Sequence, residues 1–387
     1  MMRIVLLAHA PVLGGSTELL IQARDYFLSH GHVVQCVFGT NANPADPRTA
    51  DAWIIPPVPG GWRNQMREYV RQIESFHPDI VYTFAGKDEI DVLRFLRCVR
   101  VRHTSTLEEH PFFSTPYTLK KNRGFIEACT ANTPDALEQS MRLSGQAGFL
   151  LPYLFPEPLN PITEVDPSRL MDERNPIEIA FVSRIECLQK RAQWLPEIIQ
   201  HCEKAATRLN WHFYGDGPYA SVLRSRLQNR PLVTFHGWVD RKTLYEKLPD
   251  HDILFFCSRW EGLPIAMVEG MRCGLACVST DIPAGIRWTL EQGGGWLYDA
   301  NTPVQAAEAL IKATRDRTVL LQKRREALQL AKKLFSPKVT EAEYVQLETS
   351  FAQLRYNGNS LDLNTAPRLH GVSVLTFLKR QIFKPER

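Results

Sequence analysis

The sequence lacks several features that would place it in a specialised class of protein. No stretch reaches the roughly 18 consecutive apolar residues of a membrane-spanning helix. The eight cysteines form neither a C-x-x-C pair nor a Cys/His group with zinc-like spacing, and most lie inside apolar runs. The short apolar run over residues 1–10 has no cleavage-like region after it. We therefore expect buried cysteines in a reducing compartment, a first β-strand at the N-terminus, and a cytoplasmic protein.

Charge and composition narrow the class further. The net charge of +4 over 387 residues is too small to indicate nucleic-acid binding, although it is compatible with anionic partners. With 44% hydrophobic and 23% charged residues, the composition is that of an ordinary globular protein. The chain is longer than one average domain, and its length is sufficient for two domains.

Strand-like and helical segments alternate along both halves of the chain. In the first half we expect strands over 3–8, 33–38, 80–83, 99–103 and 125–132, and helices over 17–30, 63–76, 89–98 and 116–123. In the second half we expect strands over 177–182, 211–214, 233–236, 253–257 and 276–279, and helices over 192–209, 219–227, 242–248 and 340–356, with a further helix opening near Pro264. Such alternation predicts parallel sheets covered by helices on both faces.

Prolines crowd between residues 150 and 176, where the periodicity disappears, so we place a linker there. The predicted fold class is α/β, with two Rossmann-like doubly wound domains facing a cleft. The predicted parts are an N-terminal domain (1–160), a linker (161–176), a C-terminal domain (177–338), a crossover helix (339–357) and a basic amphipathic tail (358–387). Ligands of open parallel sheets bind at the carboxyl ends of the strands, which makes the cleft the predicted site.

Two glutamates lie eight positions apart in the segment 252–281, which reads as strand, loop, helix and strand. Pro264 suits the first helical position, so Glu261 falls in the loop and Glu269 lies one to two turns into the helix. The unpaired N–H groups of a helix start, together with the helix dipole, favour a phosphate or a polyol. These donors are the N–H groups of Gly262, Leu263 and Ile265. The alternative is that both acids are merely solvated.

The run Ser-Arg-Trp-Glu-Gly-Leu-Pro over 258–264, followed by Glu269, Gly270, Met271, Cys273 and Gly274, resembles the E-x7-E signature of the retaining family-4 glycosyltransferases (glycosyl transferases group 1, GT-B fold). The resemblance is strong over 177–300 and weak in the first 170 residues. It implies that Glu269 binds the nucleotide ribose and that Glu261 holds a hydroxyl of the transferred sugar. Pro264 and its neighbours then line the donor site.

Arg184 and Lys190 follow the first strand of the second domain, where carboxyl-end loops carry the site. Their spacing resembles the pair of cations with which the family grips the donor diphosphate in place of a metal ion. Two residues depart from the family pattern, because Ser183 and Arg191 stand where glycines are usual. Arg191 is therefore a second candidate for binding the phosphates. The alternative is that these cations are solvated residues of a surface loop.

The segment Tyr-Gly-Asp-Gly-Pro over 214–218 formally matches a dinucleotide fingerprint together with Ala220. We discount that match because a proline follows the second glycine and no acid ends the next strand. The segment resembles the family's structural G-D-G-P turn, which puts Gly215 on the nucleotide side of the site. Trp238, just after the next strand, is predicted either to pack on the base or to be a rim or core aromatic.

In the first domain, Gly14 and Gly15 precede a helix and resemble the family's loop that closes on the donor phosphates. An ordinary Gly-rich turn is the alternative. His103 ends a strand and resembles the family's histidine near the transferred sugar, with His110 as the second choice. After Asp281, Gly285 stands for one glycine of the family's usual pair.

The tail over 372–383 combines apolar residues with Lys379 and Arg380, and predicts either an interfacial helix on anionic lipid or a docking or frayed segment.

The reading that follows is a metal-independent, retaining transferase without a cofactor. It uses a UDP- or GDP-linked sugar to extend a glycan or lipid-linked saccharide of the cell surface, in the cytoplasm or peripherally on the inner face of the membrane. A nucleotide-sugar epimerase and a non-catalytic nucleotide-sugar-binding protein are the alternatives, and a dinucleotide oxidoreductase is a distant third. Nucleic acid is not an expected partner.

Overall fold

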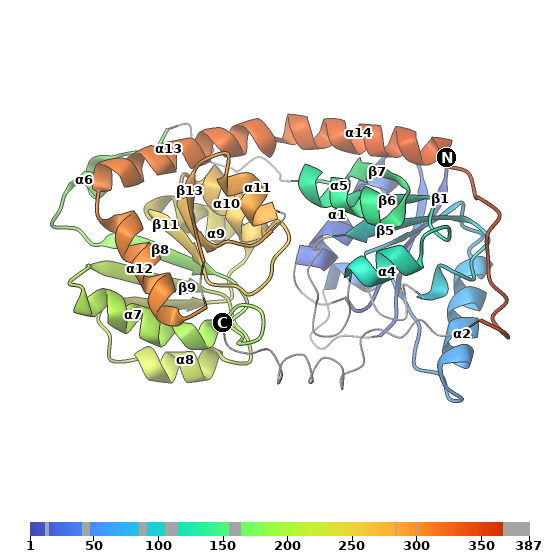
Figure 1. Cartoon of the computed structure of the whole chain (residues 1–387), viewed down its shortest axis with the longest axis horizontal. Coiled ribbons are helices and arrows are strands. Elements are labelled where there is room, and N and C mark those ends of the chain that lie inside the picture. Colours follow the sequence, from blue (N-terminus) through green and yellow to red (C-terminus); the bar gives the residue numbers. More distant parts are fainter. Residues whose placement is uncertain are drawn as a thin grey trace. The chain divides into compact units, whose positions relative to one another are not determined.

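The computed structural model describes residues 1–11, 15–40, 47–84, 91–104, 115–154, 164–283, 285–299 and 301–366 (Figure 1). The chain divides into two compact units. Unit 1 contains Met1–Leu154 and Glu341–Arg387, and unit 2 contains Phe155–Thr340. Each unit is built around its own parallel sheet, and each is described by itself.

The sheet of unit 1 has seven strands in the order β3-β2-β1-β4-β5-β6-β7 within the described residues, and every pair is parallel. The strands are β1 (Arg3–Ala8), β2 (Val33–Phe38), β3 (Trp53–Ile54), β4 (Ile80–Thr83), β5 (Val99–Thr104), β6 (Ala128–Ala131) and β7 (Ala147–Leu150). The order reverses between β1 and β4, which is the topological switch point of a Rossmann-like sheet.

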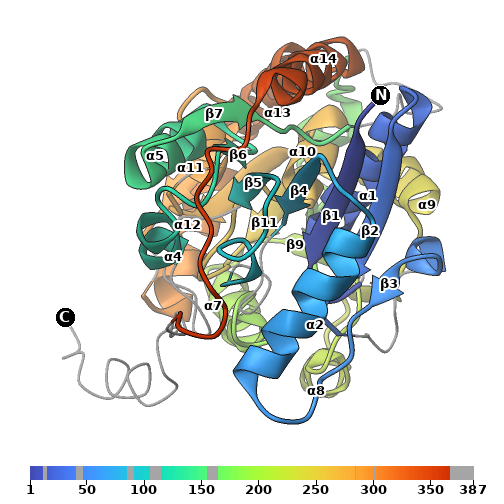
Figure 2. The same ribbon diagram turned by 90° about the vertical axis from the view of Figure 1, so that its right-hand side faces the viewer.

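Helices cover both faces of this sheet. They are α1 (Gly15–Ser29), α2 (Trp62–Ser75), α4 (Thr115–Lys121) and α5 (Pro134–Ser144), with a 3-10 turn, η1, over Pro47–Thr49. Helix α2 lies in front of the β1 and β2 ribbons in Figure 2. Its buried residues, among them Tyr69, join one core with Val5 and Leu7 of β1. On the opposite face, Phe351 of α14 (Pro337–Gln353) packs against Tyr82 of β4, with ring centroids 5.3 Å apart. Successive residues of a strand point to opposite faces, so Val5 and Leu7 face α2 while Tyr82 faces α14.

The sheet of unit 2 repeats the same topology. Its six strands run parallel in the order β10-β9-β8-β11-β12-β13 within the described residues. They are β8 (Ile177–Val182), β9 (Leu209–Tyr214), β10 (Val233–Gly237), β11 (Ile253–Phe256), β12 (Ala276–Thr280) and β13 (Gly295–Tyr298). The switch point lies between β8 and β11. The predicted class of two doubly wound Rossmann-like domains is therefore confirmed.

Helices again lie on both faces. They are α6 (Ser168–Met171), α7 (Leu195–Lys204), α8 (Ala220–Leu227), α9 (Arg241–Lys247), α10 (Ile265–Arg272), α11 (Gly285–Leu290), α12 (Pro303–Thr314) and α13 (Arg317–Leu334), with 3-10 turns η2 (Ala192–Trp194) and η3 (Leu248–Asp250). Apolar residues of α7 and α12 share a core with Ile253 and Phe255 of β11. On the other face α10 packs closely, because a Cβ on Gly270 would lie 2.7 Å from the Leu254 side chain.

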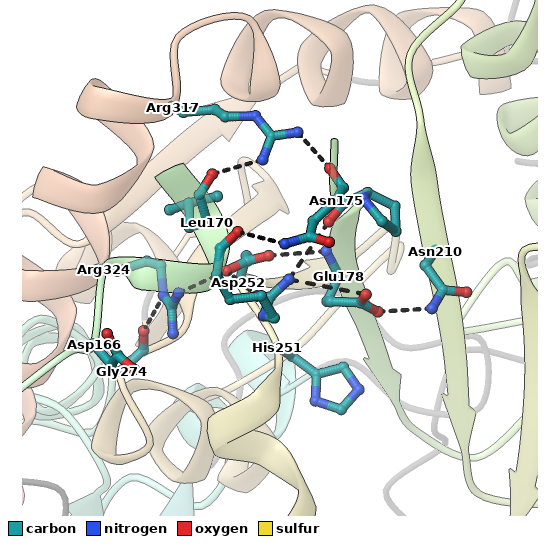
Figure 3. Close-up of polar contacts among 12 residues, drawn as sticks. Asp166, Leu170, Asn175, Glu178, Asn210, His251, Asp252, Gly274, Arg317 and Arg324 are labelled. Atoms are coloured by element: carbon teal, nitrogen blue, oxygen red, sulfur yellow. Dashed lines mark hydrogen bonds and ion pairs between the residues drawn. The ribbon is translucent and has the colours of Figure 1, made fainter. Parts of the chain in front are cut away.

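A buried polar network ties the amino ends of β8 and β11 to α6 and α13 (Figure 3). The carboxylate of Asp252 is fully buried and accepts from Arg324 Nη1 at 2.6 Å and from the Glu178 N–H at 2.9 Å. Arg169 Nη2 lies 2.5 Å from the same carboxylate. Arg317 donates to the carbonyls of Leu170 and Asn175, each at 2.6 Å, so it holds the segment that leads from α6 into β8.

Several predicted elements differ from the observed ones. The proposed linker contains α6, and its Leu170 belongs to the core of unit 2. The helix expected over 89–98 is not continuous in its described part, where residues 93–98 form turns and a bend. Arg100 explains the difference, because its guanidinium binds the carbonyls of Leu93 and Leu96, which a helix would use itself.

The helix expected over 192–209 ends at Lys204, since Ala206 adopts a left-handed backbone with φ 56°. No helix among the described residues is long and apolar enough to span a membrane. The tail from residue 367 onward, including Lys379 and Arg380, lies outside the described residues, and its lipid contact stays a prediction. The cleft between the domains also stays a prediction.

Candidate functional site

The switch point of unit 2 brings two distant segments of the sequence together. Strands β8 and β11 are neighbours in the sheet, with Ile253 opposite Ile179 and Leu254 opposite Ala180. The loops after their carboxyl ends therefore begin side by side. One loop carries Arg184 and Lys190, and the other carries Glu261, so the topology itself explains why these residues meet.

Glu186 shapes the loop that follows β8. Its buried carboxylate accepts the backbone N–H groups of Leu188 at 2.8 Å, Gln189 at 2.9 Å and Lys190 at 2.7 Å. Three N–H bonds to one carboxylate close a tight turn, and the turn ends at Lys190. The sequence analysis did not identify Glu186, although an acid a few residues before a cationic loop was a visible signal.

Lys190 and Glu261 form an ion pair between Nζ and Oε1. Both side chains are largely buried, at 17% and 7% exposed. Ser258 Oγ donates to the same carboxylate oxygen at 2.7 Å, and Gln189 Nε2 approaches Oε2 at 3.3 Å and the Trp260 carbonyl at 3.1 Å. Two of the predicted catalytic residues are thus brought together, with Ser258 and Gln189 as unpredicted partners.

The other two cations of this loop are arranged differently. Arg184 is exposed and makes no hydrogen bond or ion pair with any residue that the structure describes. Arg191 has a left-handed backbone, with φ 50° and ψ 38°, and its guanidinium lies 4.3 Å from the centre of the Trp194 ring. The backbone at Arg191 is one that glycine adopts without strain, which is the residue usual at this place in the family that the sequence resembles.

The Gly-Asp-Gly turn after β9 packs its backbone directly on the β8 loop. A Cβ on Gly215 would lie 2.0 Å from the Ser183 carbonyl oxygen, and one on Gly217 would lie 2.5 Å from that of Ile185. The Ile185 N–H donates to the Asp216 carbonyl at 2.9 Å, and the Gly215 N–H donates to the Gly237 carbonyl at 2.7 Å. Gly215 and Gly217 therefore allow the two backbones to approach closely, and the place of Gly215 on the nucleotide side of the site stays a prediction.

Helix α10 starts one residue later than expected, with Pro264 as its N-cap residue. The N–H groups of Gly262 and Leu263 make no backbone hydrogen bond to any described residue, so they remain available to a ligand. Gly285 lies against this corner, because a Cβ there would come within 2.5 Å of the Gly262 carbonyl oxygen. An anion or hydroxyl site at the start of Ile265–Arg272 stays a prediction.

Glu269 is buried, at 5% exposed, and it pairs with a cation of its own. Arg241 Nε, from the start of α9, lies 3.0 Å from Glu269 Oε1. Burial raises the pKa of Tyr245, and the nearby Glu269 carboxylate adds to that effect. The two signature glutamates are therefore held by different cations, and Arg241 is a partner that sequence reasoning missed. Trp238, between β10 and α9, is 67% exposed and presents an open aromatic face.

The residues predicted to act from the first domain are His103, with His110 as the second choice, and the glycines at 14 and 15. His103 is only 3% exposed, with Nδ1 3.0 Å from Thr130 Oγ1 and Nε2 3.2 Å from Asn132 Oδ1. Burial lowers the pKa of His103 to about 3, so the ring is neutral at physiological pH. Both ring nitrogens have partners among the described residues, and the contact of His103 with the transferred sugar stays a prediction. Gly15 begins α1, whereas Gly14 and His110 lie outside the described residues.

Within the described residues, no group of three or more His, Cys, Asp or Glu side chains is placed to hold a metal ion.

The part of the chain that carries these residues is similar to a known protein family. Residues 176–316 match the family described as Glycosyl transferases group 1. The GtfA subunit of the UDP-N-acetylglucosamine–peptide N-acetylglucosaminyltransferase of Streptococcus pneumoniae serotype 4 is 23% identical over 130 residues, 33% of this chain and 26% of that protein. The UDP-Gal:alpha-D-GlcNAc-diphosphoundecaprenol alpha-1,3-galactosyltransferase of Escherichia coli is 26% identical over 109 residues, 27% of this chain and 28% of that protein. The chain thus matches little more than a quarter of either relative.

The fold comparison extends over most of the chain. The crystal structure of Anabaena HepE in complex with UDP and glucose has a TM-score of 0.69, at 16% sequence identity, over 90% of this chain and 100% of that one. The TM-score shows a shared fold, and a sequence identity this low shows nothing beyond the fold. Residues 176–316 thus carry a match to glycosyl transferases group 1, and the chain as a whole has the two Rossmann-like domains of the GT-B fold.

Proposed function

We propose that this chain is a retaining glycosyltransferase that moves a sugar from a nucleotide-diphosphate donor to a glycan or lipid-linked saccharide of the cell surface. One observation carries the proposal. Lys190 and Glu261 meet at the switch point of unit 2, beside the start of α10, and both lie inside the segment that matches glycosyl transferases group 1.

The departing diphosphate requires positive charge that is fixed before the reaction. Lys190 supplies it from a turn that Glu186 holds closed, and exposed Arg184 adds a second cation from the same loop. The N–H groups of Gly262 and Leu263, with the start of α10 at Pro264 and Ile265, bind the remaining oxygens. These groups would neutralise the phosphates without a metal ion.

The two glutamates act as positioning groups. Glu261 Oε1 already accepts from Lys190 and Ser258, so its role is to orient the ammonium and to bind a sugar hydroxyl. Glu269, held by Arg241, binds the ribose hydroxyls, and Trp238 covers the base. Binding geometry then supplies most of the rate, with attack of the acceptor hydroxyl on the face that the diphosphate leaves.

The sugar donor that we propose carries a uridine nucleotide. HepE was crystallised with UDP and glucose, and both curated relatives named above carry a UDP-linked sugar in their names. A GDP-linked donor is the alternative that the experiment must separate. The undecaprenol-linked acceptor named for the Escherichia coli relative supports a lipid-linked saccharide as the acceptor class.

Binding and turnover of UDP- and GDP-linked sugars test the proposal. The melting temperature is measured with each nucleotide sugar, and release of free nucleotide is followed with and without a saccharide acceptor. We expect one UDP-sugar to raise the melting temperature and to be consumed. Lys190→Met should lower turnover by at least a hundredfold, whereas Lys204→Met, the same change at an exposed position of α7, should not.

The anomeric configuration of the product, read by NMR, decides between retention and inversion. A covalent glycosyl adduct on Glu261 would instead indicate a double displacement with the carboxylate as nucleophile. Isomerised nucleotide sugar without release of nucleotide would identify an epimerase. Nucleotide binding without any turnover would leave a binding protein, and the proposed transfer would then be wrong.

A further inference from the structure

The carboxyl end of the unit 1 sheet carries a cationic group that the donor site does not use. Along β5, alternate residues share one face of the sheet, and Arg100, Arg102 and Thr104 lie on it. Thr83, the last residue of β4, is the direct register partner of Arg102, and Cys129 of β6 is its partner on the other side. Both β4 and β5 end at this point.

The two arginines on this face differ in their partners. Arg100 is fully buried and pairs with Glu127, with Nη2 2.8 Å from Oε1, and it also donates to the Asn359 carbonyl at 2.7 Å. Arg102 is 1% exposed, and neither its Nε nor its Nη1 has a hydrogen-bond partner within the described chain. The hydroxyls of Thr83 and Thr104, at 0% and 2% exposed, are equally unpartnered.

No carboxylate of the described residues compensates the charge of Arg102. The titratable group that acts on it is the Cys129 thiol, and burial raises the pKa of that thiol, so it carries no negative charge at physiological pH. Burial lowers the pKa of Arg102 to about 10, which still leaves the guanidinium protonated. A buried cation without an anion is costly, and native proteins rarely keep one without a use.

We propose that Arg102, with the hydroxyls of Thr83 and Thr104, forms a binding site for an oxyanion, a phosphoryl or carboxylate group carried by the acceptor. The donors sit at the carboxyl edge of a parallel sheet, which is where open α/β sheets bind their ligands. Arginine and hydroxyl groups are the donors that proteins use for phosphate and carboxylate oxygens. The inference rests on the proposed function, since it assigns an anionic acceptor to that transferase.

Thermal unfolding with defined anions tests the site. Inorganic phosphate and glucuronate are titrated separately, in an Arg184→Ala/Lys190→Ala background that removes the proposed diphosphate cations of unit 2. We expect at least one anion to raise the melting temperature, phosphate if the group is phosphoryl and glucuronate if it is a carboxylate. Arg102→Met should weaken this response at least tenfold in apparent Kd and should raise the melting temperature without anion.

Two further variants make the result decisive. Thr83→Val/Thr104→Val removes only the unpartnered hydroxyls, so it should fold normally and should also weaken the anion response. Arg97→Met, the same loss of charge at an exposed position, should leave the response unchanged. The site is refuted if neither anion stabilises the parent, or if Arg102→Met and the threonine pair respond as the parent does.

Failure of this site is separable from failure of the transferase. In the otherwise wild-type chain, Arg102→Met should keep the rise in melting temperature that a UDP-sugar produces, because Lys190, Glu261 and Glu269 of the proposed donor site lie in unit 2. Loss of the UDP-sugar response in the wild-type chain would reject the proposed function, whatever the anion titration shows.

Discussion

Substituting Asp252 by Asn tests the polar network that anchors the sheet of unit 2. The carboxylate of Asp252 is fully buried and compensates Arg324, whose side chain is 5% exposed, and Arg169, whose side chain is 35% exposed. Asn keeps the size of the side chain but removes the negative charge, so a buried guanidinium loses its counter-ion. Burial already lowers the pKa of Arg324, and the nearby Asp252 opposes that effect.

The expected loss of stability follows from this burial. Removing one partner of a buried ion pair costs about 3–5 kcal/mol, and we take the lower end, about 3 kcal/mol, because water screens Arg169. For a unit of this size, that corresponds to a fall of about 6–12 °C in melting temperature. Differential scanning calorimetry of the Asp252→Asn variant measures the shift directly.

Two comparisons separate this effect from a general loss of charge. Asp172→Asn breaks the exposed pair with Arg174 and should leave the melting temperature unchanged. Arg324→Met added to Asp252→Asn removes the stranded cation, so the double variant should lose less stability than the two single changes sum to. A fall of less than about 1 kcal/mol for Asp252→Asn, or strict additivity, would contradict the reasoning.

Three further predictions follow from the structure. Burial lowers the pKa of His103 to about 3 and that of His251 to about 4, so on acidification the unfolded chain binds protons at these rings before the folded chain does. The free energy of unfolding is therefore unaffected by these rings above about pH 6.5, and below that pH it falls by about 1.4 kcal/mol per pH unit for each ring. His103→Asn should make this fall less steep in urea unfolding measured over a series of pH values. Gly215→Ala forces a Cβ against the Ser183 carbonyl and should lower both the melting temperature and the affinity for nucleotide, whereas Gly31→Ala, also at positive φ but with open space, should lower stability only modestly; equal effects would show that strain alone decides. EDTA should leave sugar transfer unchanged, and a loss that Mg²⁺ restores would reject the metal-independent proposal.

The sequence predicted those features that depend on local pattern. The strands over 3–8, 33–38, 80–83 and 177–182 have the predicted bounds, because short apolar runs beside glycine and proline leave few alternatives. The sequence predicts one site for Lys190 and Glu261 because both segments resemble the family's donor site and each follows a strand. The parallel pairing of β8 and β11 then brings the two loops together.

Features that depend on contacts between distant residues could not be predicted from the sequence. Arg241 lies 28 positions before Glu269, and only the packing of α9 beside α10 makes them an ion pair. The burial of His103 also depends on what covers its strand, which periodicity does not reveal. The interruption of the helix expected over 89–98 depends on Arg100, a residue outside that segment.

The discontinuity of unit 1 constrains the order in which this protein can be made. Tyr344 and Phe351 of α14 are buried against Tyr26 and Phe27 of α1, and Glu348 accepts a hydrogen bond from the Tyr26 hydroxyl at 2.9 Å. During synthesis on the ribosome, the first 154 residues emerge without this covering, and all of unit 2 is translated before it arrives. The nascent N-terminal half therefore keeps this part of its apolar surface uncovered until α14 has been translated.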